Sequence, residues 1–584
     1  MEDIGKITKI SGAVVYAKGL KNLSKNLLLR IGEDSILGEV IQIQENESII
    51  QAYEETTGIQ LGQKVVSTGG AYNALLGPKL LGQVFDGLQR PLNSESLRSM
   101  TFLARGTSVE PIDNTLEIEF FPTKTNGERI DPGQEIGYCM ENTIRHPILL
   151  PHHFQSMVID SIVEQGRYKL HATLAKFEDG NELTALHRWE VRKPRPFRAR
   201  FDKDSIFLTG QRILDSFFPI PLGGTAAISG GFGTGKTILE QTIAKNAITD
   251  IVVLVLIGER GNEVATVLDE FSHLTDENGK PLMDRTVVIV NTSNMPVAAR
   301  EASIYLGLTI AEYYRDLGLN VCLLADSISR WAEASREISS RLEEMPGEEG
   351  YPSYMSKQLG EFIERAGYFR THNNSEGSIT FIAAVSPPGG DYTEPVTQAA
   401  LQISGGFWAL NTELARSRHF PAIDWRISYS LYSETLCKKI NEEWPNWIVM
   451  RKKLLEIMEK EDELDRNVRL LGKESLSESQ KGYLRMAHLI KNAFLQQNAF
   501  DRVDMFCSLK KQHYMMKVLT LVWELFEASV KHGITSEQFF NQEDINKHYR
   551  LSETSESDEQ YFKDEIGYLE NKIRIMGDST HFLQ

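Results

Sequence analysis

Residues 230–237 match the phosphate-binding pattern G-x-x-x-x-G-K-[ST] at every fixed position, with the sequence Gly230-Gly231-Phe232-Gly233-Thr234-Gly235-Lys236-Thr237. Glycines suit such a loop because a Cβ would keep the main-chain N–H groups away from a polyphosphate. Lys236 is placed to reach the β- and γ-phosphates, and the Thr237 hydroxyl is a ligand for Mg²⁺. The pattern therefore predicts a site for a nucleoside triphosphate.

The residues on either side of this loop have the character that such a site requires. The apolar residues 226–228 before the loop predict a strand, and residues 238–244 after it predict a helix. The N-terminal end of that helix would favour phosphate through its dipole and its unpaired N–H groups. A glycine-rich turn that matches by chance is the alternative, and these flanks weigh against it.

Two acidic residues follow apolar strands in the same part of the chain. Glu259 comes after the run Ile251–Ile257, and Asp326 comes after Val321–Ala325. Ligands of open α/β sheets bind beyond the carboxyl ends of the strands, so both acids are expected near the phosphates. Asp326 is predicted to hold Mg²⁺ directly or through water, and Glu259 to orient and polarise the attacking water, with Arg260 beside it to meet phosphate charge. The alternative for each acid is an ordinary exposed strand end.

The elements that must position these residues suggest a multidomain α+β chain. Continuous apolar runs, together with a helical pattern over 297–317, predict a central doubly wound α/β P-loop domain of the RecA-like kind. Short strands near the start of the chain predict a β-barrel, and the turn-rich strands that follow predict a protruding insertion. The helical periodicity of the last third predicts a helical domain. The expected divisions are the barrel at 1–68, the α/β domain at 69–109 and 186–430, the β-rich insertion at 110–185, and the helical domain at 431–584.

The composition of the chain limits the classes of partner that it can bind and the cellular compartment in which it is expected. The chain has 584 residues and a formal net charge of −17, which disfavours nucleic acid as a partner. Four scattered cysteines fit a reducing cytoplasm. The start of the chain lacks a signal-peptide pattern, and the strongest apolar run, at 251–257, is far below the roughly 20 residues of a membrane span. Any role at a membrane is expected to pass through a partner.

Six longer motifs stand out in the chain, at residues 230–237, 258–263, 291–303, 325–334, 343–352 and 418–425. These motifs resemble those of the catalytic A subunit of V-type and archaeal-type (A-type) rotary ATPases. The similarity spans nearly the whole chain, including the barrel, the insertion and residues 495–501.

This resemblance implies an enzyme that hydrolyses or synthesises ATP and couples its turnover to the transport of H⁺ or Na⁺. It implies ATP, ADP and Mg²⁺ as ligands, Glu259 as the residue that positions water, and Arg260 as a phosphate contact. Phe420 and Phe500 would match the aromatic residues of the adenine pocket, with core packing as the alternative for both. Thr234 replaces the loop cysteine of eukaryotic relatives, which favours the prokaryotic form.

The chain also departs from the family at Gly231, where proline is frequent, and at Ile328, where threonine is usual. Neither change removes a phosphate or metal ligand, so both are compatible with activity.

The resemblance also implies an assembly. The catalytic subunit would alternate with a related non-catalytic B subunit in an A3B3 ring, the B subunit would donate an arginine finger, and central and peripheral stalk subunits would attach. The complex would place the chain in the cytoplasm, peripheral to the membrane on its cytoplasmic face.

Three alternative functions remain. A flagellar or secretion export motor is disfavoured by the insertion at 110–185, and a nucleic-acid translocase is disfavoured by the acidic charge. A non-catalytic nucleotide sensor is disfavoured by the intact Lys236, Thr237, Glu259 and Asp326.

Overall fold

The computed structural model describes residues 4–21, 23–44, 47–92, 105–106, 109–231, 233–275, 279–471 and 476–579. Contacts divide the chain into two compact units. The first unit comprises the residues up to Lys203 together with Leu222–Ala227 and Thr249–Ser404. The second unit comprises Asp204–Pro221, Ile228–Ile248 and the residues from Gly405 onward.

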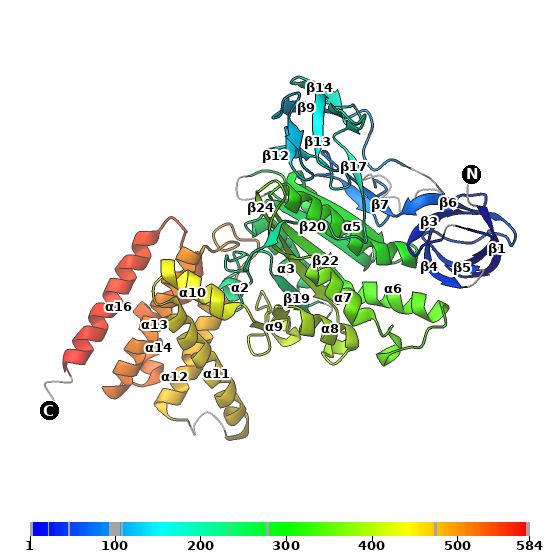
Figure 1. Cartoon of the computed structure of the whole chain (residues 1–584). Helices are drawn as coiled ribbons and strands as arrows, with labels where there is room; N and C mark the ends of the chain where they lie inside the picture. Colours follow the sequence, from blue (N-terminus) through cyan, green and yellow to red (C-terminus); the bar gives the residue numbers. More distant parts are fainter. Residues whose placement is uncertain are drawn as a thin grey trace. The chain divides into compact units, whose positions relative to one another are not determined.

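The first unit begins with a closed barrel of six antiparallel strands, drawn in blue in Figure 1. In β3 every second side chain is buried, as expected of a strand that faces the barrel interior on one side only. Val15, Leu29, Val40 and Ile50 are among the residues of this interior. The predicted N-terminal barrel is confirmed. Its strands, in the spatial order β1-β2-β5-β4-β3-β6, are β1 (Ile4–Ser11), β2 (Val14–Lys18), β3 (Leu27–Ile31), β4 (Ile36–Gln44), β5 (Glu47–Ala52) and β6 (Lys64–Ala71).

Two small four-stranded sheets follow the barrel in the first unit. Their strands are short and are separated by tight turns, such as the one at Asn126-Gly127 that precedes β10. One sheet has the order β10-β13-β15-β16 and the other has the order β12-β11-β9-β14. The strands are β9 (Glu117–Pro122), β10 (Arg129–Ile130), β11 (Glu135–Glu141), β12 (Ile144–Leu149), β13 (Met157–Ile162), β14 (Gly166–Lys169), β15 (Ala175–Phe177) and β16 (Glu182–Leu183), and β17 (His187–Glu190) pairs with β7 (Asn73–Leu76).

The centre of the first unit is a parallel sheet in which β24, β22, β20, β21 and β8 are successive neighbours. The eight residues from Ile251 to Gly258 are all buried, so the strand reads as one continuous apolar run. The expected α/β fold is confirmed. The strands are β8 (Val84–Asp86), β20 (Ile251–Glu259), β21 (Thr286–Thr292), β22 (Asn320–Asp326) and β24 (Glu376–Val385), with β18 (Ala199–Arg200) and β23 (Gly367–Arg370) paired antiparallel beyond β24.

Helices alternate with these strands along the chain. The long helix α5 packs against four of the strands and is almost entirely buried, with Glu312 and Arg315 as polar members. Their charges are compensated inside the unit, because Arg365 donates to Glu312 and Arg315 to Asp316. The helices are α4 (Gly261–His273), α5 (Val297–Asp316), α6 (Ile328–Arg341), α7 (Met355–Glu364) and α8 (Pro395–Ile403), with short 3₁₀ turns at Leu282–Arg285, Glu348–Gly350 and Pro388–Gly390.

Most of the second unit is helical. The chain contributes Asp204–Pro221 to this unit and enters it again within β19 (Thr225–Ser229). The helices predicted after residue 430 are confirmed. Helix α13 begins at Leu509, where the Ser508 hydroxyl caps it by accepting from the Lys511 N–H. The elements are α2 (Arg212–Phe217), α3 (Lys236–Asn246), β25 (Gly406–Ala409), α9 (Thr412–Arg416), β26 (Tyr429–Ser430), α10 (Ser433–Glu443), α11 (Trp447–Leu471), α12 (Glu478–Ile490), the π-helix η5 (Lys491–Leu495), α13 (Leu509–Lys531), α14 (Ser536–Phe540), α15 (Glu543–Asn546), the 3₁₀ helix η6 (Lys547–Glu553) and α16 (Glu559–Ser579).

A helix that crosses a lipid bilayer needs about 20 predominantly apolar residues. Within the described ranges, every helix is too short or too polar to cross a membrane.

Candidate nucleotide-binding and catalytic residues

The predicted phosphate loop connects β19 to α3, so its context is the strand and helix that the sequence pattern requires. Gly233 and Gly235 have φ values of +77° and +86°, a left-handed conformation that side chains with a Cβ rarely adopt. A Cβ on Gly230 would lie 2.6 Å from Thr234 Oγ1 and 2.7 Å from Leu410 Cβ. The loop therefore needs glycine at these three positions for backbone and packing reasons. Phe232 was predicted as part of this loop and lies outside the described residues.

Thr234 has a structural role in the loop rather than a surface one. Its side chain is buried, and its hydroxyl donates a 2.8 Å hydrogen bond to the Gly231 carbonyl. This bond closes the turn and leaves Gly233 exposed at its tip. The loop is thus shaped by contacts beneath it, with the glycine backbone turned outward.

Helix α3 starts directly at Lys236, and Gly235 is its N-cap residue. Since Gly235 has no side-chain oxygen to offer, the first N–H groups of the helix receive no N-cap side-chain bond. Such a helix start is suited to an anion. Lys236 is half-buried, and Thr237 is exposed at the second helical position. The start of α3 thus combines helix N–H groups, an ammonium group and a hydroxyl.

A cavity of about 670 Å³ in the second unit begins at this loop. Its volume is in the range of sites for small ligands. Phe420 and Phe500 both line it, and their side chains are 38% and 83% exposed. The exposure argues against core packing, the alternative for both residues. Phe420 also touches the phosphate loop, because a Cβ on Gly235 would lie 3.2 Å from its ring. The other lining residues come from α3 (Ile238, Leu239, Thr242), the segment 410–422 (Leu410, Arg418, Pro421, Ala422), the loop 496–504 and its surroundings (Gln211, Asn492, Gln496, Gln497, Asn498, Ala499, Asp501, Val503, Asp504), and residues 552–553.

The two predicted acids end neighbouring parallel strands of the first unit. Asp326 is the last residue of β22 and pairs in register with Leu256 of β20, three residues before Glu259 at the end of β20. Asp326 is buried, at 4% exposed, whereas Glu259 is half-buried. The strand ends therefore bring the two acids to the same edge of the sheet, as expected from the sequence.

Glu259 follows a β-bulge that explains the glycine before it. The register between β20 and β21 shifts between Ile257 and Glu259, and Gly258 has a φ of +70°. A Cβ at this position would lie 2.8 Å from Arg330 Cβ and 3.3 Å from Arg300 Cδ. Only glycine fits here, and the bulge re-aims the Glu259 side chain relative to a regular strand.

Two arginines lie near Glu259, one next to it in sequence and one that feels its charge. Arg260 is the N-cap residue of α4, and its side chain is 76% exposed, 3.9 Å from Glu263. Arg330 on α6 binds Glu333 through its Nη1 at 2.8 and 3.0 Å. That contact raises the pKa of Arg330, and the charge of Glu259 adds to the effect. Arg330 was not predicted from the sequence, although it follows Asp326 by only four residues.

With this geometry established, comparisons with known proteins identify the family. Four family models match the chain in succession: the β-barrel domain of the ATP synthase alpha/beta family at residues 7–69, its barrel-sandwich domain at 109–192, its nucleotide-binding domain at 210–430, and the C-terminal domain of V and A type ATP synthase at 438–539. The A subunit of the A-type ATP synthase of Methanopyrus kandleri is 46% identical over 556 residues, which are 94% of each chain.

The chain belongs to the A-subunit family of A-type and V-type ATP synthases. The V-type ATP synthase alpha chain of Halothermothrix orenii, 44% identical over 582 residues and 98% of each chain, agrees with this assignment. The chain is thus the catalytic, ATP-hydrolysing or ATP-synthesising subunit of a rotary ion-translocating ATPase. It binds ATP and ADP and works in a complex with other subunits. The predicted family, enzyme class and nucleotide are confirmed.

A solved structure supports the fold of this catalytic chain. The assembled ATPase EscN of the type III secretion system of enteropathogenic E. coli matches with a TM-score of 0.63 and 25% sequence identity. The match covers 88% of this chain and 99% of that one. The core is therefore shared with an ATPase of a secretion system, the class to which the export-motor alternative belongs.

Proposed function

We propose that this catalytic chain binds the phosphates of ATP with residues 230–237 and its adenine ring with Phe420 and Phe500. The observation that carries the proposal is that the phosphate loop and two exposed aromatic rings line one cavity of the second unit. Stacking of a base on an aromatic ring contributes about 1–3 kcal/mol. Exposed aromatic rings beside a phosphate loop are therefore suited to stack on the adenine base.

The proposed phosphate contacts follow from the start of α3. The N–H groups at the helix start and the Lys236 ammonium would neutralise the β- and γ-phosphates. No atom lies within 4 Å of the point where a Cβ of Gly233 would stand, so phosphates can approach the backbone there. Thr237 and Asp326 would hold Mg²⁺, since hydroxyl and carboxylate oxygens are the ligands that this ion prefers. When bound, the ion would supply positive charge that offsets the negative charge of the phosphates.

Glu259 is assigned to the attacking water. Its carboxylate would accept a hydrogen bond from the water and draw its proton away as the oxygen attacks the γ-phosphate. The Gly258 bulge supports this role, because a strand that only had to pair would not need it. Arg260 is assigned to bind the phosphate oxygens. Its side chain is exposed, so packing does not hold it in another position.

The partner that completes catalysis is proposed to be a non-catalytic B subunit that takes every second place in an A3B3 ring with this chain. Negative charge builds up on the γ-phosphate in the transition state, and an arginine supplied by a neighbouring chain accelerates phosphoryl transfer by about 10³–10⁵. Central and peripheral stalk subunits would link the ring to the membrane sector on its cytoplasmic face, with the chain in the cytoplasm.

The test is the ATPase rate per catalytic chain, measured alone and during titration with the B subunit. The isolated chain is expected to bind ATP and to hydrolyse it at no more than roughly one thousandth of the rate in the mixed ring. A B subunit with its candidate arginine changed to alanine should assemble and fail to activate. A full rate from the isolated chain would contradict the proposal and favour a self-sufficient motor of the secretion type.

A further inference from the structure

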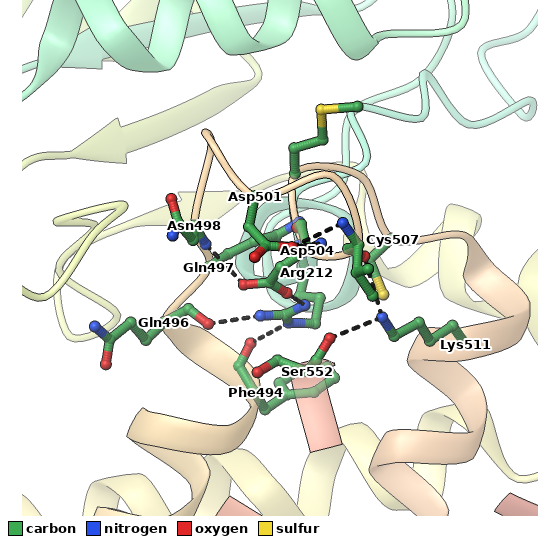
Figure 2. A network of polar contacts seen from close by, with 12 residues as sticks. Arg212, Phe494, Gln496, Gln497, Asn498, Asp501, Asp504, Cys507, Lys511 and Ser552 are labelled. Atoms are coloured by element: carbon green, nitrogen blue, oxygen red, sulfur yellow. Dashed lines mark hydrogen bonds and ion pairs between the residues drawn. The ribbon is translucent and has the colours of Figure 1, made fainter. Parts of the chain in front are cut away.

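Arg212 lies completely buried beneath the cavity that contains Phe500, and it is the hub of the network in Figure 2. Its guanidinium donates to three points of one segment that lies about 280 residues away in sequence: Nε to the Phe494 carbonyl at 2.6 Å, Nη2 to the Gln496 carbonyl, and Nη1 to the Asp504 carboxylate. A single residue of α2 therefore fixes both ends of the segment 496–504.

Further hydrogen bonds, made by Gln497, connect Arg212 to the main chain that lines the cavity. The Gln497 side chain accepts from the Arg212 N–H at 2.8 Å and donates to the Gly210 and Asp504 carbonyls, each at 2.8 Å. The Gln497 N–H donates to the Phe420 carbonyl at 2.8 Å. The network thus connects the backbones of both aromatic positions.

The Asp504 carboxylate completes the loop on its other side. Its second oxygen accepts the Asn498 N–H at 2.7 Å, and the Asn498 side chain in turn accepts the Phe500 N–H at 3.0 Å. Residues 496–508 form turns and extended chain between η5 and α13, without a helix or strand of their own. Since the Phe500 ring is 83% exposed, packing cannot hold it in place. Its position depends on the hydrogen bonds of its backbone.

We propose that Arg212 is a positioning residue for adenine binding, which acts through Gln496, Gln497 and Asp504 to hold Phe500 at the cavity. The inference rests on the proposed role of Phe500 in binding the base. Arginine is required because its planar fork makes three directed bonds at once, whereas the ammonium group of a lysine cannot span the same acceptors.

A double-mutant cycle tests this directly. The dissociation constant of Mg-ATP is measured for the full-length chain and for its variants Arg212→Lys, Phe500→Ala and the double variant. Phe500→Ala and Arg212→Lys are each expected to weaken binding about tenfold, within the range of one lost base stack. The double variant should match Phe500→Ala within about twofold, because an arginine that acts only through Phe500 has nothing left to position. Effects that multiply would overturn the inference.

Arg451 on α11 supplies a matched control. It also donates to main-chain carbonyls of α2, to Ser216 at 2.9 Å and Phe217 at 2.7 Å, but at the other end of that helix. Arg451→Lys is expected to leave ATP affinity within about twofold, even where its melting temperature falls as much as that of Arg212→Lys. Equal losses of affinity in the two lysine variants would mean a general structural effect and would refute positioning.

Two further outcomes separate the inference from the proposal on which it rests. If Phe500→Ala leaves the affinity for ATP unchanged, the proposed role of Phe500 is wrong and the inference falls with it. If Phe500→Ala weakens binding and Arg212→Lys does not, only the inference is wrong. Where Arg212→Lys does not fold, Asp504→Asn takes its place in the cycle, because its amide NH₂ opposes the Asn498 N–H and loosens the same loop.

Discussion

The two units of this chain carry different parts of the proposed chemistry on different kinds of support. In the first unit, Glu259 and Asp326 end strands that are buried along nearly their whole length. In the second unit, the phosphate loop, Phe420 and Phe500 stand on loops that are tied down by hydrogen bonds at their bases. The contrast suggests that the groups assigned to reaction are fixed by strand packing, and that the groups assigned to binding can adapt.

The largest effect is expected on the binding side, from Lys236→Ala. Removing this ammonium group takes positive charge away from the phosphates of both the bound substrate and the transition state, so kcat/KM should fall by roughly 10⁴-fold, within the range for a cation that neutralises charge on the γ-phosphate. The measurement is steady-state ATPase activity of the assembled complex. Lys245→Ala, on the last turn of the same helix, is the control and should retain activity within about twofold. Unimpaired turnover in Lys236→Ala would remove the basis for assigning the site to residues 230–237.

On the reaction side, a Mg²⁺ titration should distinguish the two acids at the strand ends. Glu259→Gln keeps the shape of the side chain but loses the charge that polarises water, and should lower kcat roughly 10³-fold at every Mg²⁺ concentration, with ATP affinity retained. Asp326→Asn should instead raise the Mg²⁺ concentration needed for half-maximal rate. Asp269→Asn, the same kind of change on α4, is the control. Loss of binding in Glu259→Gln would make that residue structural, and an unchanged titration in Asp326→Asn would contradict its metal role.

Two buried carboxylates, Asp316 in the first unit and Asp215 in the second, are held in different ways. In the first unit, burial alone would raise the pKa of Asp316, but Arg315 and Arg195 outweigh burial and lower it. In the second unit, Asp215 accepts hydrogen bonds from the Thr209 N–H and hydroxyl at 3.0 and 2.7 Å and from Gln512 at 3.3 Å. These bonds offset burial only in part, and the pKa of Asp215 is raised to about 7.

The smallest expected effect follows from that pKa. In the unfolded chain Asp215 ionises near its ordinary value, so between about pH 4 and pH 7 only the folded state keeps the proton. The folded state therefore loses stability as pH rises through this window. Between pH 5 and pH 7 the loss is about 2–3 kcal/mol. Asp215→Asn should abolish it, as measured by urea unfolding at both pH values with the exposed Asp558→Asn as control. Equal pH dependence in the wild-type chain and Asp215→Asn would contradict the raised pKa.

The sequence predicted the elements that carry strong local patterns. The strands ending at Glu259 and Asp326 are continuous apolar runs, and the phosphate loop has a fixed spacing of glycines, so both could be found without tertiary contacts. The exposure of Phe420 and Phe500 could not be predicted, because an aromatic residue in a loop has the same local pattern in a core and in a cavity wall.

Long-range contacts were beyond the reach of the sequence. Arg212 lies in a short helix, and its partners Gln496 and Asp504 are nearly 300 residues further along the chain, so no spacing rule connects them. Arg330 is nearer to its motif, but only the Gly258 bulge reveals that it lies beside the strand carrying Glu259. In both cases the missing information was which distant segment packs against an apparently ordinary arginine.

The closed barrel at the start of the chain has a consequence for assembly. An open sheet ends in strands whose N–H and C=O groups invite pairing with another chain, which leads to runaway aggregation. In this barrel β6 returns to pair with β1, so its strands offer no such edge. In a complex with other subunits, this barrel can therefore touch a neighbouring chain without merging sheets. Contacts between this barrel and a neighbouring chain would then be made by side chains, and such contacts can be specific and reversible.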